Sequence, residues 1–154
     1  MKRRLTAVAL IAALAGCGGG DDGDGDDGPA PREELHHIHG LGVDARSGDL
    51  FIATHNGLFV APAGRTSVRR VGDSRQDIMG FSVAGPRRFV GSGHPAPGAQ
   101  LTPNLGLIES VDGGRTWRNV SLLGEADFHV LRSAGRTVYG VDSATGRLMA
   151  SRDA

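Results

Sequence analysis

The chain has 154 residues, with 17 lysines and arginines against 17 aspartates and glutamates, so its formal net charge at pH 7 is zero. Proteins that bind nucleic acids use an excess of basic residues to neutralise phosphates, and this balance therefore argues against a nucleic-acid partner. The single cysteine excludes a disulfide framework. The 25 glycines and the scarcity of helix-period patterning favour short strands and turns, and hence an all-β fold.

The N-terminus has the pattern of a lipoprotein signal peptide. Basic residues at positions 2–4 precede an apolar run at 5–14, which is too short to span a bilayer. Residues 14–17, Leu-Ala-Gly-Cys, then form a lipobox. We predict that residues 1–16 are the signal peptide and that Cys17 is lipidated, which makes the membrane a partner and the location extracytoplasmic, at the bacterial cell envelope. The alternative is an ordinary secretory signal that leaves Cys17 as a free thiol.

The segment after this cysteine is predicted to be a flexible tether. Residues 18–31 are nearly all Gly, Asp, Ala and Pro, and their five aspartates repel one another. Such a composition cannot bury enough apolar surface to fold. We therefore assign residues 17–31 to the tether and residues 32–154 to the folded domain.

The folded part repeats one pattern of apolar strands. Residues 78–85 align with residues 128–135 at an offset of 50 residues, and residues 38–43 are a similar segment nearer the N-terminus. Each is followed by two further short apolar runs, which we expect to be strands, at 50–53 and 57–60, at 89–91 and 106–109, and at 138–141 and 147–150. A repeat of about 40 to 50 residues is typical of β-propellers. The sequence predicts a partial β-propeller of about three four-stranded antiparallel blades, near residues 36–73, 74–122 and 123–154.

Three units are too few to close a propeller, which has about four to eight blades. We therefore expect the chain to be the N-terminal part of a longer propeller, incomplete at its C-terminus. The alternative, a self-sufficient domain of three units, leaves an open sheet edge at each end of the array.

Residues 110–117, Ser-Val-Asp-Gly-Gly-Arg-Thr-Trp, fit the Asp-box motif Ser-x-Asp-x-Gly-x-Thr-Trp, which forms the turn between the third and fourth strands of propeller blades. Adjacent glycines tolerate positive φ, the aspartate accepts N–H groups of the turn, and the tryptophan packs against the blade. We predict a structural role for Ser110, Asp112, Gly114, Thr116 and Trp117.

The six histidines are the most suggestive chemical feature. They open the first strand of a predicted unit or follow its second strand, and in a propeller both places lie at the mouth of the central channel. We predict that a ligand-binding face forms there from His37, His39, His55, His94, His129, Arg75 and Asp142.

Imidazoles grouped with carboxylates are suitable ligands for Zn²⁺ or Cu²⁺. Strand alternation places His37 and His39 on one side together with Leu41 and Val43. We therefore name His36, His37 and His39 as candidate metal ligands. Because no compact metal-ligand spacing is present, the alternative is that these histidines pair with backbone groups or cap loops.

Five segments carry a resemblance to a known family: residues 36–42, 72–81, 91–95, 103–110 and 121–129. Together they resemble a bacterial lipoprotein family of Asp-box propellers that is labelled glycosyl hydrolase or sialidase-like and is distantly similar to the sortilin ectodomain. The resemblance covers essentially everything after the tether. It implies the propeller fold and glycan hydrolysis, although a shared fold does not carry function.

The residues themselves specify no nucleophile. A sialidase needs a tyrosine nucleophile, but the only tyrosine, Tyr139, lies within a predicted strand and is expected to pack in the blade. Other glycosidases need a facing carboxylate pair, for which Asp77 with Asp127, or Glu125 with Asp127, are the candidates. The alternative is that Glu125 and Asp127 cap the loop into the next strand.

Two function classes stay open. The first is an envelope-anchored binding protein that recognises a glycan, a peptide or a metal on its histidine-rich face. The second is a glycoside hydrolase whose catalytic set is completed by further blades.

Overall fold

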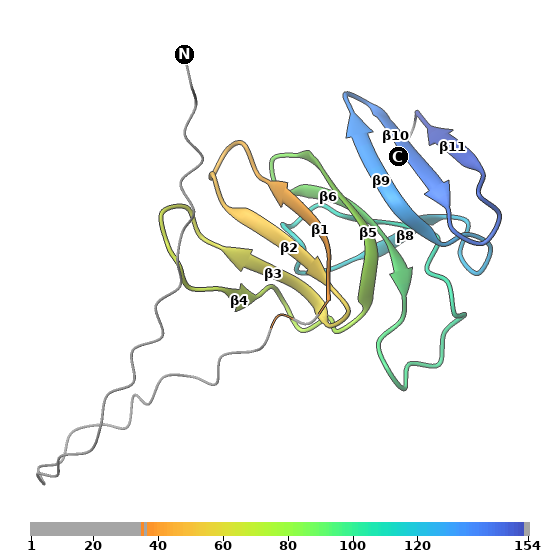
Figure 1. Cartoon of the computed structure of the whole chain (residues 1–154), viewed down its shortest axis with the longest axis horizontal. Coiled ribbons are helices and arrows are strands. Elements are labelled where there is room, and N and C mark those ends of the chain that lie inside the picture. The colour runs from red at the N-terminus through yellow and green to blue at the C-terminus, as the bar shows by residue number, and fades with distance from the viewer. Residues whose placement is uncertain (1–34, 36, 153–154) are drawn as a thin grey trace, which may run out of the picture. The chain divides into compact units, whose positions relative to one another are not determined.

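The computed structural model describes residue 35 and residues 37–152, and every regular element among them is a β-strand (Figure 1). All the strands belong to one compact unit, Glu33–Ala154. The predicted signal peptide, Cys17, the tether and His36 lie outside the described residues. Within the described part of the chain, no helix is long and apolar enough to cross a membrane.

Within residues 37–152, eleven strands form three antiparallel sheets, and strands that are neighbours in the chain are also neighbours in the sheet. The first sheet contains β1 (Ile38–Val43), β2 (Leu50–Thr54), β3 (Gly57–Ala61) and β4 (Arg69–Arg70). The second contains β5 (Asp77–Gly85), β6 (Arg88–His94), β7 (Leu107–Ser110) and β8 (Arg118–Ser121). The third contains β9 (Phe128–Ala134), β10 (Thr137–Asp142) and β11 (Leu148–Ser151). The all-β prediction is confirmed, and each of the nine apolar runs expected to be a strand coincides with one.

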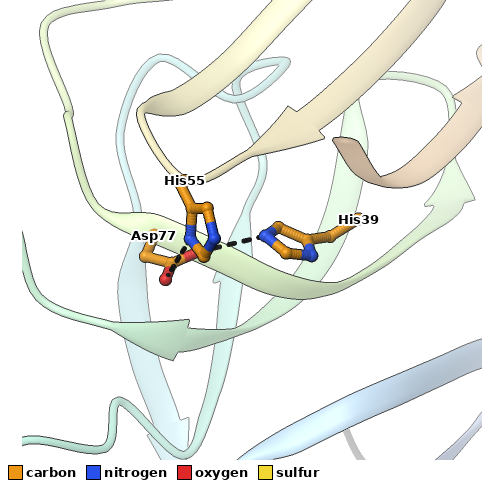
Figure 2. Close-up of side chains that lie close together, drawn as sticks. All are labelled: His39, His55 and Asp77. Carbon is orange, nitrogen blue, oxygen red and sulfur yellow. Dashed lines mark hydrogen bonds and ion pairs between the residues drawn. The ribbon is translucent and has the colours of Figure 1, made fainter. Parts of the chain in front are cut away.

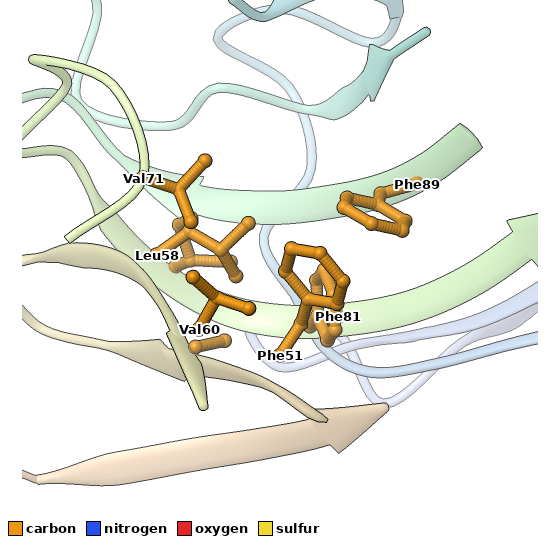
Figure 3. Close-up of a cluster of buried hydrophobic side chains, with 8 residues drawn as sticks. Phe51, Leu58, Val60, Val71, Phe81 and Phe89 are labelled. Atoms are coloured by element: carbon orange, nitrogen blue, oxygen red, sulfur yellow. The ribbon is translucent and has the colours of Figure 1, made fainter. Parts of the chain in front are cut away.

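A hydrophobic core joins the first sheet to the second (Figure 3). Its aromatic centre is Phe89, whose ring centroid lies 4.5 Å from that of Phe51 and 5.6 Å from that of Phe81. Glycines let β1 approach β5 closely, because a Cβ at Gly42 would lie 2.6 Å from Cγ2 of Val83. The other buried members of this core are Ala53, Leu58, Val60, Val71 and Ile78.

A second core joins the second sheet to the third, through Val90, Leu107, Ala126, Phe128, Leu131 and Val138. The backbones of β5 and β9 come so close that a Cβ at Gly80 would lie 2.2 Å from the carbonyl oxygen of Phe128. Two serines of the second sheet accept backbone N–H groups from β9 across this contact. The first strands of all three sheets therefore lie side by side, with β5 between β1 and β9 (Figure 1).

Each of these first strands carries an irregularity at the same place. The register skips one residue between Ile38 and Gly40, between Ile78 and Gly80, and between Phe128 and Val130. The skipped residues are His39, Met79 and His129. A β-bulge bends the strand and re-aims the side chain at the bulge. The simple alternation expected for β1 is therefore wrong at His39, which is largely buried while Leu41 and Val43 are more than half exposed.

The turn from β7 to β8 has the hydrogen bonds expected of residues 110–117. Asp112 Oδ1 accepts from the Ser110 hydroxyl at 2.8 Å and from the Thr116 backbone at 3.0 Å, and Oδ2 accepts from the Thr116 hydroxyl at 2.6 Å. Gly113 and Gly114 have φ of 77° and 87°, and Trp117 packs against the first core. Burial acts to raise the pKa of Asp112, but the hydrogen bonds outweigh it and lower that pKa from 3.8 to about 2.

Candidate metal centre

Two histidines and an aspartate converge where the first and second sheets meet (Figure 2). His39 lies at the bulge of β1, His55 in the turn between β2 and β3, and Asp77 at the start of β5. His55 Nδ1 lies 2.6 Å from Asp77 Oδ2, and His39 Nε2 lies 3.8 Å from Asp77 Oδ1. One donor atom from each of the three residues lies within 4.8 Å of the other two. This is a compact donor set of two nitrogens and one oxygen.

Local hydrogen bonds hold His55 in this position. The Thr54 hydroxyl donates to the carbonyl of Gly57 at 2.9 Å and accepts the N–H of Asn56 at 3.0 Å, which closes the turn around His55. Gly57 has φ of 101°, and a Cβ there would lie 2.4 Å from the carbonyl oxygen of Ser74, so the turn sits directly against the segment that leads into β5. The sequence therefore builds a tight turn that brings His55 to Asp77.

The electrostatics of this set favour a neutral imidazole at His39. Burial and the neighbouring His55 lower the pKa of His39 against the opposing effect of Asp77, and His129 and His37 lower it further. His39 Nε2 and Asp77 Oδ1 are buried and have no hydrogen-bond partner among the described residues. A buried polar atom without a partner costs free energy unless another group or an ion satisfies it. A metal ligand needs this state, an unprotonated imidazole beside an ionised carboxylate.

A second set of three lies where the second and third sheets meet. His94 ends β6, His129 occupies the bulge of β9, and Asp127 precedes β9. Asp127 Oδ2 lies 2.8 Å from His129 Nε2 and 3.8 Å from His94 Nε2. Again, one donor atom from each residue lies within 4.8 Å of the other two.

The two sets are neighbours. Asp77 and His94 face each other in the antiparallel pair of β5 and β6, and residues paired in this way project from the same face of a sheet. His129 of the second set contributes to the lowered pKa of His39 in the first. We call the six residues together the histidine rim: His39, His55, Asp77, His94, Asp127 and His129.

The remaining predicted ligand-face residues lie outside both donor sets. His37 is exposed, and its ring centroid lies 4.9 Å from that of His55. Arg75 is exposed in the loop before β5. Asp142 is 4% exposed, and its carboxylate accepts N–H groups of Asp127 and Ala144 and the Thr145 hydroxyl. Asp142 thus holds the turn after β10 and supports the second set instead of adding a donor to it.

The residues predicted as catalytic candidates differ in their exposure and in their contacts. Glu125 is exposed in the turn before β9, whereas Asp127 is 7% exposed, so the two carboxylates do not share an environment. Asp77 and Asp127 each contact imidazoles. Tyr139 is 43% exposed, so the expectation that it packs inside the sheet structure is wrong.

Sequence reasoning named all six members of the rim but not their division into two sets. One sequence feature pointed to this division into two sets, because Asp77 and Asp127 are separated by the same 50 residues as the repeated strands. It missed the three bulges, the carbonyl of Pro103 that His94 contacts, and Ser143, which contacts Asp127. These depend on loop conformation and strand register, which short apolar runs do not specify.

Comparison with known proteins gives no match, either to a family model or to a curated protein.

Proposed function

We propose that the histidine rim binds a divalent transition metal, Zn²⁺ or Cu²⁺, and that the chain is a binding protein. The proposal rests on the set of His39, His55 and Asp77, whose donor atoms lie within 4.8 Å of one another. Two of these atoms, His39 Nε2 and Asp77 Oδ1, are buried and make no hydrogen bond within the described part of the chain. An ion placed among the three residues would satisfy both.

The donor types favour these two metals. Zn²⁺ is commonly held by three protein ligands drawn from histidine and carboxylate, and imidazole is also a good ligand for Cu²⁺. Ca²⁺ and Mg²⁺ prefer shells made of oxygen atoms, and two of the three donors here are nitrogens. The side chains of His39 and Asp77 are 19% and 18% exposed, and that of His55 is 39% exposed. The set is therefore shielded but open to an ion from solvent.

We further propose that the three sheets are successive blades of an Asp-box propeller that is anchored to the bacterial envelope by a lipid on Cys17. The meander order of each sheet, the 50-residue offset of the first strands and the turn at residues 110–117 support the propeller. The Leu-Ala-Gly-Cys sequence at positions 14–17 supports the anchor. This assignment is consistent with the resemblance to propeller lipoproteins labelled glycosyl hydrolase.

Glycoside hydrolysis is the alternative that this label implies. The histidine rim favours binding over hydrolysis, because the carboxylates of Asp77 and Asp127 both contact histidines. The third candidate, Glu125, is exposed.

Isothermal titration of the full chain with ZnCl₂ and with CuCl₂ tests the proposal. Cys17→Ser is used throughout so that the only thiol does not compete. We expect saturable binding that His55→Ala weakens strongly. His37→Asn is the matched control, because His37 lies on the same face outside both donor sets, and asparagine tolerates its positive φ of 46°. Absence of binding, or equal loss in both variants, would contradict the proposal.

Turnover of aryl glycosides provides the second test. We expect no hydrolysis of sialyl or neutral aryl-glycosides by the full chain. Hydrolysis that Asp127→Asn abolishes would instead support the hydrolase.

A further inference from the structure

We infer that the chain binds two transition-metal ions, and that the second ion is held by His94, Asp127 and His129 independently of the first. This inference rests on the proposed function, because it assigns a second site to the same rim. The second set takes no donor from the first, and its own donor atoms meet the same 4.8 Å limit.

The protonation pattern of His94 indicates a cation site. Its Nδ1 lies 2.9 Å from the carbonyl oxygen of Pro103, which can only accept, so Nδ1 carries the proton. Nε2 is the other ring nitrogen, and it lies 3.8 Å from Asp127 Oδ2. A cation between this nitrogen and this oxygen would contact both. Metal-bound histidines characteristically donate their other N–H to a carbonyl or carboxylate in this way.

Several hydrogen bonds fix the position of Asp127 in the second set. Its Oδ2 is 2.8 Å from both His129 Nε2 and the Ser143 hydroxyl, whereas its Oδ1 is buried without a partner. The backbone N–H of Asp127 donates to Asp142 Oδ1 at 3.1 Å, and its carbonyl accepts the N–H of Ser143 at 2.8 Å. A carboxylate whose backbone and Oδ2 are fixed by hydrogen bonds in this way is a preorganised ligand.

The two histidines leave the second site accessible. The side chains of His94 and His129 are 38% and 42% exposed, whereas that of Asp127 is 10% exposed. An ion can therefore reach the imidazoles from solvent and then contact the shielded carboxylate. Binding would replace the Nε2 proton of His129, because one nitrogen lone pair cannot hold both.

The repeated architecture explains why there are two sites. In each, a histidine at or just after the end of a sheet's second strand meets the aspartate that leads into the first strand of the next sheet: His55 with Asp77, and His94 with Asp127. In each, the third donor is a bulged histidine, His39 or His129. The histidine–aspartate pair is thus the same junction formed twice, whereas the third donor differs in origin. His39 belongs to the first sheet, together with His55, and His129 belongs to the third sheet, which Asp127 leads into.

Metal stoichiometry tests the inference. The full chain with Cys17→Ser is titrated with Zn²⁺ against a chromophoric chelator, and bound zinc is counted per chain. We expect two ions for this parent, one for His55→Ala and one for the double variant His94→Ala with His129→Gln. Combining all three substitutions should leave none. His37→Asn is again the control and should retain two.

The outcomes separate this inference from the proposed function. A single ion, lost through His55→Ala but retained by the double variant, would overturn the second site and leave the first. A single ion lost in either variant would show one shared site and would also overturn the inference. Absence of zinc binding by the parent would overturn both. Because His94 and His129 are partly exposed, their replacement should preserve the fold, and circular dichroism checks this.

Discussion

The two ends of the second sheet use aspartate in opposite ways. In the turn at residues 110–117, both carboxylate oxygens of Asp112 accept hydrogen bonds from the turn. At the other end, Asp77 and Asp127 each keep one buried oxygen without a partner and lie beside imidazoles. A carboxylate whose oxygens all accept hydrogen bonds stabilises a fold, whereas one with an unpartnered oxygen beside imidazole nitrogens can bind a cation. Substitutions at the two ends should therefore have opposite consequences.

The largest effect is expected from Asp77→Asn. The amide cannot replace the carboxylate charge on a metal ion, so we expect the affinity of the first site for Zn²⁺ to fall roughly 1,000-fold, or about 4 kcal/mol. Stability without metal should change little, because the asparagine side chain can still hydrogen-bond His55 Nδ1. Titration calorimetry measures the first quantity and urea unfolding in a chelating buffer the second. A large loss of stability would show that Asp77 is structural, like Asp112.

Asp112→Ala should produce the reverse pattern. It removes three hydrogen bonds to a charged group and leaves the N–H of Thr116 without its acceptor. We expect the free energy of unfolding to fall by about 3 kcal/mol, since hydrogen bonds to charged groups contribute about 1.5 to 3 kcal/mol each and the turn relaxes in part. Zinc affinity should not change. Urea unfolding and calorimetry on the same preparation test both statements.

The free energy of unfolding that Asp112 contributes through this turn should decrease as the pH falls. The pKa of Asp112 is lowered from 3.8 to about 2, so its stabilisation is complete above pH 3.8 and is lost as the pH falls toward 2. At about 1.36 kcal/mol for each unit of pKa the corresponding loss is at most about 2 kcal/mol, and solvent screening at this exposed turn reduces it. Urea unfolding between pH 5 and pH 2 measures it. Asp112→Ala should lose less stability over this range than the parent, and equal losses would contradict the role of Asp112.

Much of the fold could be predicted from sequence, because alternating apolar runs and the turn at residues 110–117 are local signals. The three sheets follow from them. The grouping of the site residues was harder to predict from sequence. The sequence placed His55, His94 and His129 on one face, but their grouping depends on which sheets adjoin and on bulges in the first strands. The sequence predicts His37 as a metal ligand together with His39, yet the donors that lie near His39 come from β5 and from the turn between β2 and β3. His36 lies outside the described residues.

The smallest predicted effect concerns Met79, the third bulged residue. It occupies the position in β5 that His39 and His129 occupy in β1 and β9, and β5 lies between those strands. A thioether is a soft ligand that favours Cu(I) over Zn²⁺. We therefore expect Met79→Leu to weaken Cu(I) binding about tenfold, or about 1.4 kcal/mol, and to leave Zn²⁺ binding unchanged. Met149→Leu, a similar change in the second core, is the control. Competition with a Cu(I) chelator measures the affinity, and an equal effect of both substitutions would show that the bulge of β5 does not direct Met79 toward the rim.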